Sequence, residues 1–213
     1  MSSDRRTAVT AGVLYFVTHV TSVAALALYG GSGTAADVLA GRRTQVLTGA
    51  VLEIVLAVAV VGTGIALFPL LRERAPAVGA GYLGLRTLEA SVIVAGVVTI
   101  LPIVASPAST AVPTLAPGVA QGLALVHDWT FLIGPGLIVP FHTVLLAAHL
   151  WRSGRTPRFI PALGLVGGPL VGVMNLAVMA GVTDVVPVLV LPVFAWEISL
   201  AAFLVLRGLR TPA

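Results

Sequence analysis

The sequence contains no cysteine, and this absence removes several classes of protein chemistry. Disulfides, thiolate metal sites, iron–sulfur clusters and cysteine nucleophiles all need a residue type that the chain lacks. Lysine is absent as well, so the formal net charge of +4 comes entirely from arginine. Charged residues make up only 9% of the 213 residues, whereas soluble domains typically carry about 25%. The chain therefore has too little polar surface to cover a globule in water.

Apolar residues are correspondingly abundant, at 58% of the sequence with a mean hydropathy of +1.06. Six apolar runs are long enough, at 1.5 Å per helical residue, to cross a hydrocarbon core of roughly 30 Å. They lie near residues 8–29, 46–71, 78–104, 123–150, 159–182 and 185–206. The sequence thus predicts an all-α fold, in which residues 1–213 form a single polytopic domain of six transmembrane helices surrounded by lipid.

The arginines between the runs predict an orientation. Nine of them fall on one side of an even-numbered bundle: Arg5, Arg6, Arg72, Arg74, Arg152, Arg155, Arg158, Arg207 and Arg210. Only Arg42 and Arg43 fall on the other side, so the positive-inside rule predicts that both termini are cytoplasmic. Such arginines orient helices, and the basic pI near 10.7 therefore does not indicate a nucleic-acid partner. The bias toward alanine, valine, glycine and arginine favours the inner membrane of a bacterium.

Two of the predicted helices contain residues that interrupt regular helical hydrogen bonding. The fourth carries Gly134-Pro135-Gly136 and then Pro140, and the fifth carries Gly167-Gly168-Pro169. Proline removes a backbone donor and clashes with the preceding turn, so we expect a kink in each helix. Carbonyls freed in this way line binding sites in many transporters. An ordinary kink filled by a neighbouring helix is the alternative, and we favour it because proline and glycine are common in membrane helices.

The most informative residues are ionisable groups far from either end of a predicted helix. Five of them lie 10 to 15 residues from the nearest flanking arginine, or about 15 to 22 Å along a helix. They are Glu53, Arg86, Glu89, Glu197 and His19. A charge that faced lipid at such a depth would cost roughly 2.5–3.5 kcal/mol. We therefore expect these groups to face one another in a single interior polar cluster.

Helical spacing adds members to this cluster. Tyr82, Arg86 and Glu89 share one helix face, and Arg86 and Glu89 are placed to form an ion pair three residues apart. Asn175, on the fifth helix, lies at a depth from which it can join them.

The charges of the predicted cluster do not balance. Once Arg86 is paired with Glu89, Glu53 and Glu197 have no cation unless His19 is protonated. Two such carboxylates at low dielectric hold a proton or bind a cation. Our leading hypothesis is a small transporter or ligand-binding protein that takes a small molecule, a proton or a cation. A structural or accessory protein whose ion pairs only fix helix packing is the first alternative. An intramembrane enzyme that uses the same carboxylates is the second and the least favoured.

The start of the fourth helix offers a candidate entrance on the outer side, where His127 and Asp128 precede Trp129. Trp129 is typical of an interfacial anchor. His127 and Asp128 either gate access to the cluster or simply form a solvated helix start, with the aspartate near the positive end of the helix dipole.

No cofactor is predicted. His142 and His149 share a helix face near the cytoplasmic end of the fourth helix, but haem ligation would need a partner histidine at matching depth. The scattered histidines and carboxylates lack zinc-ligand spacing, and whether the cluster takes another metal stays open. Gly30-Gly31-Ser32-Gly33 matches the pattern of rhomboid-type proteases, but no later helix offers its serine a partnered histidine. We assign no catalytic residue.

Several segments of the chain resemble a known family. They include residues 81–90 (GYLGLRTLEA), residues 152–158 (RSGRTPR) and residues 192–197 (PVFAWE). Together with Leu52-Glu53, these segments resemble the bacterial membrane family known as domain of unknown function 4386, over nearly the whole chain. The resemblance implies a multi-pass membrane protein and supplies no activity, ligand or site residue.

Overall fold

We analysed a computed structural model of the chain, which describes residues 3–29, 42–105 and 115–209. These residues form helices and turns, with no strand among them. The helices are α1 (Ser3–Tyr29), α3 (Arg43–Arg72), α4 (Pro76–Ala105), α5 (Pro117–Phe131), α6 (Val139–Ser153), α7 (Phe159–Met179) and α8 (Leu191–Leu206). A π-helix, η2 (Leu132–Ile138), joins α5 to α6, and a 3-10 turn, η3 (Pro187–Val190), leads into α8. The Gly30–Gly33 motif lies outside the described residues.

Six helical segments are long and apolar enough to cross a membrane, as the hydrophobic runs predict. The fourth is the longest, because α5, η2 and α6 form one continuous rod over Gly118–Ser153. It begins at Pro117, six residues earlier than its hydrophobic run indicates. Proline is favourable at the first turn of a helix, where its missing N–H would have no partner anyway.

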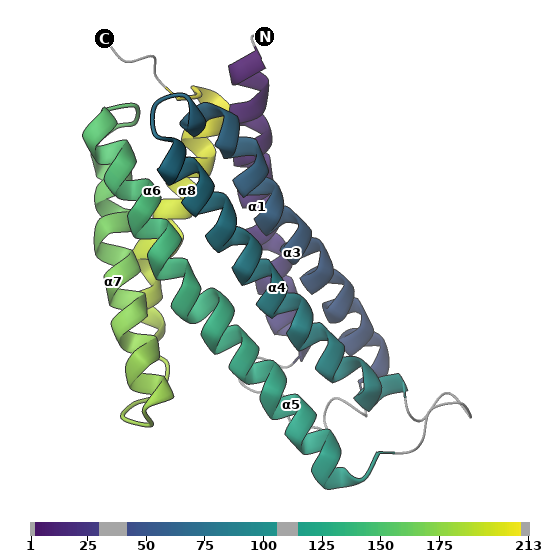
Figure 1. Cartoon of the computed structure of the whole chain (residues 1–213). Helices are drawn as coiled ribbons and strands as arrows, with labels where there is room; N and C mark the ends of the chain where they lie inside the picture. Colours follow the sequence, from purple (N-terminus) through teal and green to yellow (C-terminus); the bar gives the residue numbers. More distant parts are fainter. Residues whose placement is uncertain (1–2, 30–41, 106–114, 210–213) are drawn as a thin grey trace.

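The six segments form a closed ring in chain order. Each packs against the next, and α8 returns to pack against α1. The start of α1 and the end of α8 therefore lie at the same end of the bundle, called here the terminal end (Figure 1). Arg5 of α1 donates to the carbonyl of Leu204 there, at 2.8 Å. That the terminal end faces the cytoplasm stays a prediction.

At the opposite end, called here the distal end, the ring is wider on one side. The rod formed by α5 and α6 runs obliquely to α7, and α5 diverges from α7 toward the distal end (Figure 1). The first four segments contain 27 to 36 residues and the last two 21 and 20, so the two groups differ in length by about two to four helical turns. Tilting is the usual way for a long helix to fit a bilayer about 30 Å thick.

The two proline-containing helices differ. In the fourth segment, the π-helix spans the predicted Gly134-Pro135-Gly136 interruption. The carbonyl of Gly136 cannot bond to residue 140 in the α-helical manner, because Pro140 has no N–H. Asn175 Nδ2 of α7 donates to this carbonyl instead, at 3.1 Å. In the fifth segment, α7 continues as an α-helix through Pro169. A bend of either helix axis stays a prediction.

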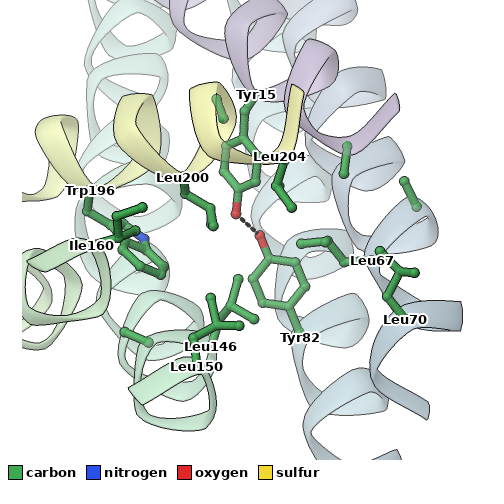
Figure 2. Packing of buried hydrophobic residues seen from close by; sticks show 14 of the residues in the cluster. Tyr15, Leu67, Leu70, Tyr82, Leu146, Leu150, Ile160, Trp196, Leu200 and Leu204 are labelled. Atoms are coloured by element: carbon green, nitrogen blue, oxygen red, sulfur yellow. Dashed lines mark hydrogen bonds between the residues drawn. The ribbon is translucent and has the colours of Figure 1, made fainter. Parts of the chain in front are cut away.

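The terminal half of the bundle is closed by a large apolar core. Its buried side chains come from all six segments, and Tyr15, Tyr82 and Trp196 are among the largest. Figure 2 shows the hydroxyl groups of Tyr15 and Tyr82 meeting in a hydrogen bond at its centre, with Leu200, Leu204 and Leu146 around them. This core separates the polar interior described next from the terminal end.

Candidate functional site

Arg86 is the centre of a buried polar cluster, and it is only 2% exposed. Its Nη1 donates to Glu89 Oε2 at 3.0 Å, which is the ion pair that the helical spacing predicts. Its Nε donates to the hydroxyl of Thr63 on α3, also at 3.0 Å. The guanidinium carbon lies 5.5 Å from the centre of the Tyr15 ring, within range of a cation–π contact. Arg86 is therefore held from three helices.

His142 belongs to this cluster, although the sequence analysis placed it near the cytoplasmic end of its helix. It is 1% exposed, and its Nε2 lies 3.0 Å from Glu89 Oε2. Because a carboxylate oxygen only accepts, this shorter contact requires a proton on Nε2, although Arg86 Nη1, itself a donor, lies 3.3 Å from the same nitrogen. His142 precedes Arg152 by ten residues. Glu197 was selected because it precedes Arg207 by the same number of residues. The spacing to a flanking arginine was therefore sufficient to identify His142 as well.

Glu197 and His19 form the more accessible side of the cluster, with side chains 16% and 10% exposed. Glu197 Oε1 lies 3.8 Å from Arg86 Nη1, and its Oε2 lies 3.4 Å from His19 Nε2. The other ring nitrogen of His19, Nδ1, lies 2.8 Å from the carbonyl oxygen of Tyr15. A carbonyl only accepts, so Nδ1 carries a proton. A hydrogen bond between Nε2 and Glu197 then needs one further proton, on either the imidazole or the carboxyl group.

Tyr82 borders the cluster as predicted from its helix face. Its ring packs edge-on against His142, with 5.6 Å between ring centres, and its hydroxyl meets that of Tyr15. Asn175 plays a different part. Its Nδ2 donates to the carbonyls of Gly136 and Val171, and thereby supplies the carbonyl of Gly136 with the donor that Pro140 lacks. Neither of these hydrogen bonds goes to a carboxylate of the cluster.

Glu53 does not join Arg86, and the prediction of one cluster is wrong in this respect. Its two carboxylate oxygens each lie 3.2 Å from Nε2 of His127, and both residues are buried, at 1% and 3% exposed. The depth of Glu53 was predicted from its distance to the distal end of α3. The depth of Arg86 was predicted from its distance to the terminal end of α4. Because both helices contain 30 residues, about 45 Å, these equal offsets end at different depths.

Two cavities border these groups. The central cavity, of about 200 Å³, is lined by His19, Arg86, Glu89 and Glu197. The distal cavity, of about 800 Å³, lies between α1, α3, α5 and α7 and is lined by Glu53, His127 and Asp128, among others. Ser22 and Phe131 contribute to the walls of both. The polar interior is thus adjacent to a larger space on its distal side and to the apolar core on its terminal side.

His127 and Asp128 border the distal cavity, and that they form an entrance on the outer side stays a prediction. His127 is buried, so it is no solvated helix start, while the side chain of Asp128 is 37% exposed. His149, the other histidine considered for haem, does not line either cavity. Within residues 3–29, 42–105 and 115–209, no three histidine, aspartate or glutamate side chains are grouped in a way that would hold a metal ion.

The fold and this interior define a multi-pass α-helical membrane protein with buried charge. More particularly, residues 10–208 match the family described as a domain of unknown function (DUF4386), and the chain belongs to that family. The family resemblance inferred from the sequence is thereby confirmed. No curated protein and no solved structure matches the chain.

Proposed function

We propose that this chain is a small membrane transporter whose central cluster exchanges a proton during transport. The hydrogen bonding of His19 carries the proposal. Its Nδ1 donates to the carbonyl of Tyr15, so Nε2, which lies 3.4 Å from Glu197 Oε2, can donate to that carboxylate only if the imidazole takes up a second proton. Histidine is the side chain that gains and loses a proton most readily near neutral pH.

The location of this pair supports the proposal. His19 and Glu197 line the central cavity, and the distal cavity lies directly beyond it. The apolar core closes the opposite side, around the Tyr15–Tyr82 hydrogen bond. A site with a cavity on one side and a packed core on the other is the arrangement that alternating access requires of one conformational state.

The other half of the cluster favours a second role, the structural one. Arg86 is satisfied by Glu89 and Thr63, and Glu89 by Arg86 and His142. All four residues are less than 5% exposed. We therefore divide the cluster into a fixed part around Arg86 and an exchanging part at His19 and Glu197.

Replacement of Glu197 by glutamine tests the exchanging part. In infrared spectra of the protein in lipid films, we expect a protonated-carboxyl band that appears and disappears reversibly as the pH is cycled, and we expect Glu197→Gln to remove it. A second measurement uses liposomes that contain a pH-sensitive dye, to which a panel of candidate ions is added one at a time. The wild type should move protons when an ion that it transports is added, and the variant should not. The melting temperature should change little, because glutamine keeps the shape and hydrogen-bonding capacity of the side chain.

Glu73→Gln is the matched control, since Glu73 is an exposed carboxylate in the turn between α3 and α4. It should retain both signals. An unchanged carboxyl band in Glu197→Gln, or a band that never responds to pH in the wild type, would exclude the proposed proton exchange.

A further inference from the structure

We propose that the distal cavity binds a small protonated organic amine with an apolar body, held by Glu53 and Tyr29. The proposal names a substrate class for the transporter proposed above, and it rests on that function only in taking the amine to be the transported compound. The binding itself follows from three features of the cavity: its charge, an unpartnered hydroxyl group and its apolar lining.

The charge of the lining is negative. Three carboxylates contribute to it, those of Glu53, Asp128 and Asp184, and no arginine is among its described lining residues. Among the described lining residues, His127 is the only side chain that can carry a positive charge, so the carboxylates outnumber the cations there. A cation in the cavity would offset them, whereas an anion would be repelled.

The second feature is the hydroxyl group of Tyr29. This side chain is 5% exposed and lines the cavity. Its hydroxyl is near enough to Glu53 to interact with that carboxylate, but it makes no hydrogen bond of normal geometry to the described residues. The ring packs against Gly49, one turn before Glu53 on α3, at a point where a Cβ would come within 2.6 Å of it. Leaving a buried hydroxyl without a hydrogen bond is unfavourable. Its oxygen is free to accept a hydrogen bond from the N–H of an amine bound beside Glu53.

The rest of the lining favours an organic cation over a metal ion. Aromatic rings of Trp129 and Phe131 and the aliphatic side chains of Leu26, Leu125 and Val178 form much of the wall. Aromatic faces attract cations with apolar substituents, whereas hard metal ions take six or more oxygen ligands. The volume of about 800 Å³ lies within the range of 300–1,000 Å³ typical of small-molecule sites.

The test compares two water-soluble compounds of nearly the same shape, 2-phenylethylammonium and the neutral 2-phenylethanol. Each is titrated calorimetrically into the purified full chain in detergent micelles and into empty micelles. We expect saturable binding of the ammonium compound only. Glu53→Gln should weaken it about tenfold or more, because a buried countercharge is lost. Tyr29→Phe should weaken it severalfold through the lost hydrogen bond.

Asp184→Asn gives an independent readout if Glu53→Gln does not fold, because Asp184 is exposed and lines the cavity rim. It should reduce the affinity in the same direction, whereas Glu73→Gln, outside the cavity, should leave it unchanged. Equal binding of the alcohol, full affinity in all three cavity variants, or no saturable binding by the wild type would each overturn the proposal. Amine binding without a pH-responsive carboxyl band would instead reject the proton exchange and leave the amine site standing.

Discussion

Replacement of Arg86 by methionine should destabilise the protein by about 3–5 kcal/mol, which is the range for removing one partner of a buried ion pair. Arg86 neutralises Glu89 at 3.0 Å and is the closest guanidinium to Glu197, at 3.8 Å. Methionine fills the same space but leaves Glu89 with His142 alone. The loss should appear as a large fall in melting temperature in detergent, measured by tryptophan fluorescence.

Two further variants isolate the cause. Arg72→Met removes an exposed arginine at the end of α3 and should change stability by no more than about 0.5 kcal/mol. The double variant Arg86→Met/Glu89→Met removes both charges and should recover much of the lost stability, because apolar replacements of a complete buried pair are often neutral. A double variant as unstable as Arg86→Met alone would show that lost packing, and not an unpaired carboxylate, is responsible.

Replacement of Gly167 by alanine should cost about 1–3 kcal/mol, the usual range for overpacking a tight interface. A Cβ at this position would lie 2.5 Å from the backbone nitrogen of Val193 and 2.8 Å from the carbonyl carbon of Pro192. Both are backbone atoms, so α7 and α8 would have to separate. Small residues commonly allow this close approach between membrane helices. The same thermal melt in detergent measures the loss.

Gly84→Ala on α4 is the control. A Cβ there has no neighbour within 4 Å, and alanine is the better helix former, so stability should be unchanged or slightly higher. If Gly167→Ala melts at the wild-type temperature, α7 and α8 do not approach as closely as described. The structure also gives Gly167-Gly168-Pro169, where a helix kink was predicted from the sequence, a packing role. Its first glycine lies where α7 meets α8, and α7 stays helical through Pro169.

The sequence predicted the side-chain contacts that depend on residue spacing along a single helix. Arg86 and Glu89 are three residues apart on one helix, so their ion pair follows from helical geometry alone. The contact of Glu197 with Arg86 could also be predicted, because each residue lies about ten positions from an arginine or a helix end on the same side of the membrane. His142 obeys the same rule and was missed because its proximity to His149 suggested a haem ligand instead.

Glu53 illustrates the limit of such counting. Depth measured from one end of a helix is informative only if the helix length is known, and α3 and α4 each extend well beyond a bilayer thickness. Which residue meets Glu53 depends on the start of α5, six residues earlier than the hydrophobic run indicated, and on the position of its helix in the ring. No spacing within one helix carries that information, so the Glu53–His127 pair and the distal cavity beside it emerged only from the packed structure.

The sequence by itself determined that this protein crosses a membrane as six helices and that it carries charge inside. Both properties follow from transfer free energies of single residues, which depend on residue type and on depth along one helix. The tertiary structure alone decided that the charge is divided between two sites, and that one carboxylate is paired with Arg86 at 3.0 Å while another lies 3.4 Å from His19. Those outcomes depend on distances between side chains of different helices, which are set by the tilt and rotation of each helix in the ring.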